Sequence, residues 1–297
     1  MILFGTNPIA WTNDDDVSIG AHLTLDDCLS DCRTIGFDGI EKGHLMPDDG
    51  TALKARLGDY GLRFVGAWHS TNLLVNDLAT EKAALMKTID MIRAAGGSHI
   101  NACECSNTVH GNDAVAVNDR PIMTDAEWQR FSEGYEALSV FAAEQGVPMG
   151  YHHHMGTIIE SPEDIDRFMA MAGPATRLLL DTGHCLFGGG DPAVLARKHM
   201  HRVTHIHAKN IRRPIMDQVR AERLSFLEGV RRGVFTVPGD PEGCVDFPPV
   251  LAAAAQAGYA GWLVIEAEQD SAQRDPLHYQ SMGHRALRAM AATAGLD

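Results

Sequence analysis

Three consecutive histidines, His152, His153 and His154, follow an apolar run at 147–150. The run predicts a β-strand, and because side chains alternate along a strand, His152 and His154 share one face while His153 points to the other. Two neutral imidazoles at the end of a strand suit a divalent metal ion. A loop with locally hydrogen-bonded histidines explains the run about equally well, so the interpretation depends on how other strands end.

Three later apolar runs also finish in side chains that can bind a metal ion or exchange a proton. These side chains are Asp181, His205, His207, Lys209 and Glu266. One carboxylate at a strand end is commonplace, but several successive strands that end in this way indicate a shared site. A mixture of imidazole and carboxylate donors with open positions suits a catalytic Mn²⁺, Co²⁺ or Zn²⁺ ion, and donor softness alone does not choose among them.

Eight strand-then-helix units along the chain would bring these strand ends together. The expected strands are 2–5, 36–41, 62–69, 96–104, 147–154, 177–181, 202–210 and 261–266. Helical signals occur at or near 24–32, 53–57, 81–95, 124–138, 161–164, 191–192, 224–230, 250–257 and 277–294. This alternation predicts an α/β protein with a parallel sheet, and eight units predict one closed (β/α)8 TIM barrel domain over 1–297. In such barrels the working residues lie at the carboxyl ends of the strands.

Composition limits the classes of partner. The 25 basic and 39 acidic residues give a formal net charge of −14, which disfavours nucleic-acid binding and fits a small neutral substrate better. Six cysteines show no dense disulfide framework, which favours a reducing cytoplasm. The N-terminal residues lack a signal-peptide pattern and no apolar run reaches membrane-spanning length, so we expect no membrane partner.

Five segments resemble the inosose dehydratase family. They are 5–15, 151–157, 181–184, 233–240 and 261–270. This family belongs to the xylose isomerase-like barrels, which also include ketose epimerases and endonuclease IV. The similarity covers nearly the whole chain, and the stretches YHHHMGT at 151–157 and WLVIEAEQD at 262–270 are specific to the dehydratases.

The resemblance implies a divalent metal ion held by one residue from each of the last four strands. The superfamily usually supplies Glu, Asp, His and Glu, and here Asp181, His207 and Glu266 match the last three. The first position falls on His152, which departs from the family pattern, and His154 is the alternative ligand. The resemblance favours Mn²⁺ or Co²⁺, with Zn²⁺ as an alternative, and adds glutathione as a further candidate cofactor.

The reaction implied by the resemblance is loss of water from myo-inosose, a polyhydroxycyclohexanone, through an enediolate to a trihydroxycyclohexane-dione in inositol catabolism. A base must remove the proton beside the ketone, and an acid must protonate the departing hydroxyl. The candidate catalytic residues, which the sequence does not rank, are Glu266, His154, His69 and Lys209. The candidate substrate-binding residues are His184, Glu41, Asn7 and Trp11. The alternatives are a hydrogen bond from His184 to a metal ligand, a surface position for the Glu41 carboxylate and ordinary packing for Trp11.

Two other functions compete with dehydration. A sugar isomerase or epimerase on the same barrel would share the enediolate but would return the proton rather than expel hydroxide. A nonenzymatic metal- or sugar-binding protein would bind the same ligands without turnover. In every case the expected partner is a small polyol-ketone or sugar, and the sequence leaves open whether the chain forms a homo-oligomer.

Overall fold

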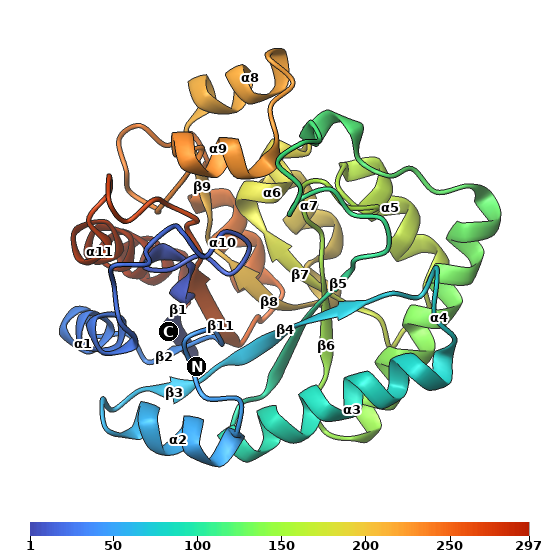
Figure 1. The fold of residues 1–297 in the computed structure, drawn as a ribbon, viewed down its shortest axis with the longest axis horizontal. Helices are drawn as coiled ribbons and strands as arrows, with labels where there is room; N and C mark the ends of the chain where they lie inside the picture. The colour runs from blue at the N-terminus through green and yellow to red at the C-terminus, as the bar shows by residue number, and fades with distance from the viewer. Residues whose placement is uncertain (297) are drawn as a thin grey trace.

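A computed structural model describes residues 1–296 and shows a parallel β-barrel surrounded by helices (Figure 1). Its strands are β1 (Ile2–Thr6), β2 (Gly39–Ile40), β3 (Arg63–Phe64), β4 (Gly66–Thr71), β5 (His99–Glu104), β6 (Met149–His152), β7 (Arg177–Asp181), β8 (Val203–His207) and β11 (Gly261–Ile265). The sheet order is β3-β2-β1-β11-β8-β7-β6-β5-β4.

The barrel closes through one stretch of chain. Strands β3 and β4 are separated only by Val65, yet β3 pairs with β2 and β4 pairs with β5. The two ends of the nine-stranded sheet are therefore two parts of a single continuous strand, which makes eight strands around the barrel. The predicted (β/α)8 fold is confirmed.

The helices lie outside the strands (Figure 1). They are α1 (Leu25–Ile35), α2 (Gly50–Gly58), α3 (Leu78–Ala95), α4 (Asp125–Glu144), α5 (Pro162–Met171), α6 (Thr182–Phe187), α7 (Pro192–His199), α8 (Arg213–Ala221), α9 (Phe226–Arg232), α10 (Phe247–Gln256) and α11 (Pro276–Ala294). Side-chain caps mark several starts: Thr24, Thr124 and Ser161 each form a capping box. No helix within residues 1–296 is long and apolar enough to cross a membrane.

The strand expected at 202–210 is too long. Strand β8 ends at His207, and β9 (Asn210–Ile211) instead pairs antiparallel with β10 (Phe235–Thr236) outside the barrel sheet. Helices α6 and α8 were not expected from the sequence either. Helix α6 starts where β7 ends because the Asp181 side chain accepts a hydrogen bond from the backbone N–H of His184 and caps the helix.

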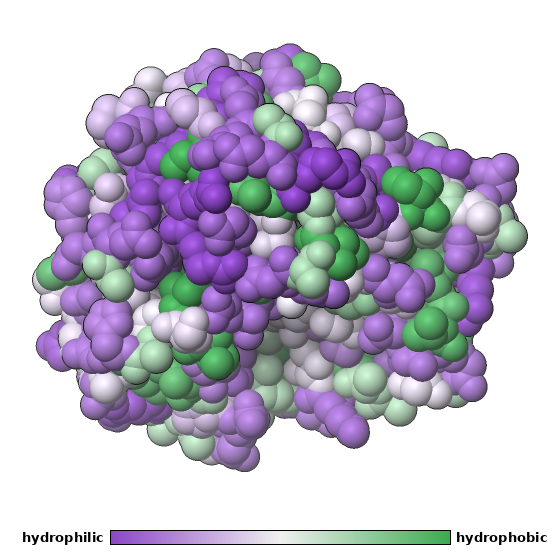
Figure 2. Space-filling model, turned by 45° about the horizontal axis from the view of Figure 1, so that its top comes forward, coloured by the Kyte–Doolittle hydropathy of each residue, from purple (hydrophilic) through white to green (hydrophobic). Residues whose placement is uncertain are grey.

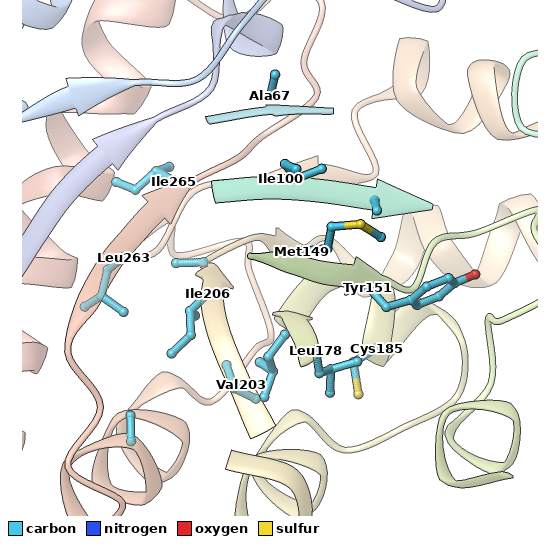
Figure 3. Packing of buried hydrophobic residues seen from close by; sticks show 14 of the residues in the cluster. Ala67, Ile100, Met149, Tyr151, Leu178, Cys185, Val203, Ile206, Leu263 and Ile265 are labelled. Carbon is cyan, nitrogen blue, oxygen red and sulfur yellow. The ribbon is translucent and has the colours of Figure 1, made fainter. Parts of the chain in front are cut away.

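Side-chain alternation gives the strands an outer apolar face, and in β6 and β8 the inner face carries histidines. Figure 3 shows Met149 and Tyr151 of β6 among the buried residues of the main core. The Tyr151 ring packs against the rings of Phe131 in α4 and Phe168 in α5, so this face points toward the helices. The intervening His152 therefore points to the other side, toward the barrel axis. The apolar shell stabilises the fold, and the inner face is free to carry chemistry.

We predict that Gly66→Ala destabilises the protein. Gly66 pairs with His99 where β4 begins, and a Cβ atom there would lie 2.2 Å from the His99 carbonyl oxygen. Backbone atoms on both strands would have to separate, so the free energy of unfolding should fall by about 1–3 kcal/mol. Chemical denaturation monitored by circular dichroism measures the change.

Gly58→Ala in α2 is the matched control. A Cβ atom at Gly58 meets nothing within 4 Å, and the residue is helical, so alanine should raise stability by about 0.5–1 kcal/mol. Equal stabilities for the two variants would contradict the close backbone approach of β4 and β5 at Gly66.

Candidate metal centre and active-site cavity

Four side chains from consecutive strand ends meet at the carboxyl-terminal side of the barrel. Each offers one ligand atom within 4.8 Å of the others, and all four are buried; they are His152, Asp181, His207 and Glu266. The His207 Nδ1 atom lies 2.8 Å from Glu266 Oε2 and 3.6 Å from Asp181 Oδ2. The His152 Nε2 atom lies 3.5 Å from Asp181 Oδ2. The structure thus brings together the four ligands expected from the sequence, with His152 rather than His154 in the group.

The donor atoms of this cluster fit a divalent cation. His152 Nε2, Asp181 Oδ2, His207 Nδ1 and Glu266 Oε2 are all buried and lack a hydrogen-bond partner within the described chain. Buried polar atoms are rarely left unpaired, and a cation would satisfy all four at once. Two imidazole nitrogens and two carboxylates form a donor set suited to Mn²⁺, Co²⁺ or Zn²⁺.

Glu41 orients His207 through the ring nitrogen that faces away from the cluster. Its Oε1 atom lies 2.9 Å from His205 Nε2 and 3.1 Å from His207 Nε2. A carboxylate only accepts, so each histidine carries a proton on Nε2, and His207 Nδ1 is the ring nitrogen that faces the cluster. Asn7 Nδ2 and Asn101 Nδ2 also donate to Glu41. Glu41 was expected to bind substrate hydroxyls, but protein donors already occupy both its oxygens.

Burial and neighbouring charges strongly shift the pKa values of the side chains in the cluster. Burial alone would lower the pKa of His207, but Glu266 and Glu41 outweigh burial and raise it well above its usual value. Burial opposes ionisation of Asp181, yet the positive charge of Lys209 holds its pKa well below the ordinary range. A cation that binds here therefore displaces a proton from His207 and joins ionised carboxylates.

The surroundings of Lys209 favour its ammonium form. Burial would lower its pKa, but Glu266, Glu268 and Asp181 outweigh burial and raise it. The side chain is fully buried and is absent from the lining of the cavity described below. Three nearby carboxylates stabilise the ammonium form and so disfavour Lys209 as a proton acceptor, and its catalytic role stays a prediction.

Two histidines beside the cluster are uncharged. Burial is the main reason why the pKa values of His154 and His184 lie well below normal. The Nδ1–H of His154 donates to the Met155 carbonyl at 2.8 Å, which leaves Nε2 unprotonated. The His154 and His184 rings lie 3.9 Å apart, so both expected site residues belong to one region. His153 points elsewhere, as alternation predicted, and accepts the backbone N–H of Asp181.

A cavity of about 310 Å³ opens onto the cluster. Its lining is mostly polar and includes Asn7, Ile9, Asp14, Asp15, Glu41, Lys42, Trp68, Ser70, Asn101, His110, His154, His207, Glu266 and Glu268. The indole of Trp68 packs edge-on against the rings of His152 and His154, 5.4 Å and 5.9 Å away. Figure 2 shows that the surface on the side of α8 and α9 is predominantly hydrophilic, which suits the approach of a polar ligand.

Two expected site residues, His69 and Trp11, lie outside both the cavity lining and the groups of possible metal ligands. His69 faces α3, where its Nδ1 atom lies 2.9 Å from Thr88 Oγ1, because Trp68 and Ser70 occupy the cavity side of the same strand. Trp11 is fully buried and donates its indole N–H to Asp31. The expected catalytic role of His69 and substrate contact of Trp11 are therefore wrong.

Asn7 reaches the cavity, but its side chain is already engaged. Its amide donates to Glu41 and its carbonyl caps the short 3-10 helix η1 (Pro8–Ala10) by accepting the Ile9 N–H. Asn7 therefore supports the position of Glu41, and both of these contacts are to protein groups.

Sequence reasoning missed Glu268, His110 and Asp15, which all line the cavity. Glu268 follows Glu266 by two residues, and alternation could have placed both on one side. Burial raises the pKa of Glu268 to about 7, despite the opposing charge of Lys209. His110 and Asp15 come from loops far apart in sequence and lie 3.9 Å apart, so only the tertiary structure unites them.

A closed barrel with imidazoles and carboxylates at the carboxyl ends of its strands is the arrangement of a metal-dependent (β/α)8 enzyme. A family model described as "Xylose isomerase-like TIM barrel" matches residues 29–290. The chain therefore belongs to the xylose isomerase-like TIM barrel family, and within it to the group that contains the inosose dehydratases.

Full-length relatives support this placement. An inosose dehydratase of Glaesserella parasuis is 39% identical over 98% of this chain and 98% of its own length. The rhizopine catabolism protein MocC of Rhizobium meliloti is 40% identical over 99% of this chain and 90% of its own length. A solved structure titled IOLI protein with a binding zinc atom superposes with a TM-score of 0.69 at 12% identity, covering 98% of this chain and 99% of that one. That last likeness concerns the fold alone.

We predict that Glu41→Gln weakens metal binding about 10- to 100-fold. The neutral amide no longer holds both Nε2–H groups as a carboxylate does, so His207 Nδ1 loses its fixed direction and part of its basicity. Competition against a fluorescent chelator measures the affinity for Mn²⁺ or Zn²⁺.

Glu104→Gln is the control for damage to a buried carboxylate. Glu104 also accepts several hydrogen bonds, from Thr71, Leu73 and Ser106, but it lies outside the cluster. Its substitution should leave metal affinity within about threefold of wild type, since it touches no ligand. Equal affinities of wild type and Glu41→Gln would show that Glu41 does not orient His207.

Proposed function

We propose that the protein is a metal-dependent hydro-lyase that removes water from myo-inosose to give a trihydroxycyclohexane-dione in inositol catabolism. The observation that carries the proposal is full-length similarity, near 39% identity, to proteins named inosose dehydratase. The buried cluster at the strand ends supplies the chemistry that such a reaction requires.

His152, Asp181, His207 and Glu266 would hold the ion. When bound, a divalent metal supplies Lewis acidity that stabilises negative charge on the ketone oxygen as the neighbouring proton leaves. We propose Mn²⁺ or Co²⁺ as the working ion, with Zn²⁺ as the alternative, because all three accept mixed nitrogen and oxygen donors.

We propose His154 as the proton acceptor and Glu268 as the proton donor, because both line the cavity beside the ligands. His154 is neutral and its Nε2 atom is unprotonated, so it can take the proton from the carbon next to the ketone. Glu268, whose pKa is about 7, can carry a proton to the departing hydroxyl. Lys209 acts through Glu268, because its Nζ atom lies 2.6 Å from the Glu268 carboxylate and positions it.

The lining fits a neutral polyol. Carboxylates of Asp14 and Asp15 accept hydrogen bonds from hydroxyl groups, whereas an anionic substrate would meet repulsion. We therefore propose a small polyol-ketone as the partner. The location that we propose is the cytoplasm, because the six cysteines show no dense disulfide framework. Glutathione as an additional cofactor is tested by adding it to the metal-reconstituted protein and measuring the rate.

We predict that Asp181→Ala, His207→Ala and Glu266→Ala each reduce dehydration of myo-inosose at least about 1,000-fold, since each removes one ligand of the ion. The assay follows the ultraviolet absorbance of the dione, with bound metal measured by elemental analysis. His69→Gln is the matched control, because that histidine faces α3 away from the cavity, and its kcat should stay within about threefold of wild type. Wild-type rates in any two of the three alanine variants would disprove the site.

Metal removal and mass spectrometry separate dehydration from its rivals. Chelator-treated protein should lose activity and regain it with Mn²⁺ or Co²⁺, and the product should be lighter than the substrate by one water. A product of unchanged mass would indicate an isomerase or epimerase instead. Binding of metal and inosose without any turnover would indicate a nonenzymatic binding protein.

A further inference from the structure

A second group of metal-type donors lies beside the first cluster. His154, His184 and Glu268 each offer one ligand atom within 4.8 Å of the other two, and all three are buried. They come from the segment after β6, from α6 and from the segment after β11. Two imidazoles and a carboxylate are a common ligand set for a divalent ion.

The ammonium of Lys209 already contacts two of these three donors, Glu268 and His184. Its Nζ atom lies 2.6 Å from Glu268 Oε1 and 2.9 Å from His184 Nε2. It also lies 3.1 Å from Glu266 Oε2, a ligand atom of the first cluster. The Phe235 ring covers the ammonium at 4.5 Å, and no part of the side chain reaches solvent. Lys209 therefore sits where a cation is surrounded by donors on several sides.

The backbone around Lys209 is shaped to hold its side chain. A Cβ atom at Gly183 would lie 2.5 Å from Lys209 Cγ, so only glycine leaves room for the lysine stem. The Thr182 hydroxyl accepts the Lys209 N–H at 3.0 Å and donates to the Lys209 carbonyl at 2.7 Å. These contacts fix the start of the side chain and aim the ammonium at the donors.

Two of the three donors need little movement to bind a metal ion instead. Glu268 Oε1 and His184 Nε2 stand 2.6 and 2.9 Å from Nζ, and metal–ligand distances are about 2.0–2.2 Å, so each must move inward by under about 1 Å. His154 offers a ligand atom within 4.8 Å of both. Glu268 Oε2 is buried without a hydrogen-bond partner within the described chain and could add a further bond. A lysine supplies one charge here, and an ion would supply two.

We propose that Lys209 is an internal cation that occupies a second metal site formed by His154, His184 and Glu268, and thereby restricts the protein to one divalent ion. Removing the lysine side chain opens this site to a second ion. The inference rests on the first metal cluster but is independent of which reaction the protein catalyses.

The test counts bound ions. Wild type and Lys209→Ala are each loaded with Mn²⁺, freed of excess ion by gel filtration and analysed for metal per chain. We expect Lys209→Ala to hold one more ion per chain than wild type, and its electron paramagnetic resonance spectrum to show two interacting Mn²⁺ ions. The wild-type spectrum should show isolated Mn²⁺.

Two variants serve as controls. Lys209→Met removes the charge but keeps the space filled, so it should gain no ion. The double variant Lys209→Ala/His184→Ala removes one donor of the opened site and should lose the additional ion. An extra ion in Lys209→Met, or its retention in the double variant, would place it elsewhere and overturn the proposal.

The readout is the difference in bound ions per chain between wild type and variant. Failure of the first metal site can therefore be distinguished from failure of the second. No ion in wild type would contradict the first cluster, whereas equal counts in wild type and folded Lys209→Ala would overturn the second site alone. If Lys209→Ala is insoluble, Lys209→Ser is scored in the same way. Interacting Mn²⁺ pairs in wild type would refute the proposal whatever the variants show.

Discussion

Burial of negative charge at one end of the barrel is the constraint on which the rest of the structure depends. Asp181, Glu266 and Glu268 are all within 4 Å of the Lys209 ammonium and almost wholly excluded from solvent. An unpaired buried carboxylate is costly, so positive charge must be held among them. The Lys209 ammonium supplies part of this charge, and a metal ion can pair the donor atoms that it leaves unsatisfied.

The same constraint explains the polar interior of the barrel. The His99 and His205 rings stack in the barrel interior with their centres 4.4 Å apart. Aliphatic side chains usually occupy such positions in TIM barrels. His205 and Asn101 both donate to Glu41, which in turn holds His207. Part of the barrel interior is thus occupied by a hydrogen-bonded network that orients the metal ligand His207. The outer faces of the strands supply most of the hydrophobic burial.

Loops from distant parts of the chain complete the cavity above this support. Arg231 at the end of α9 contacts Asp16 from the loop after β1 and Asp113 from the loop after β5. These contacts hold together segments that carry the cavity residues Asp15 and His110. Each such ion pair is partly exposed and individually weak, so the roof of the cavity is tied more loosely than its base.

The sequence by itself determined the barrel and the four candidate ligands. Strand and helix periodicities act over short distances, and the carboxyl ends of parallel strands must meet, so a wider set of strand-end residues that includes these four was predictable. The resemblance to the inosose dehydratases then selected His152, Asp181, His207 and Glu266, which the structure brings together. Only the tertiary structure decided which candidates share the cavity. The His69 ring faces α3, and Glu41 accepts hydrogen bonds from histidines of another strand. Three carboxylates around Lys209 favour its ammonium form. Those outcomes depend on packing and charge between segments far apart in the chain, which local sequence patterns do not encode.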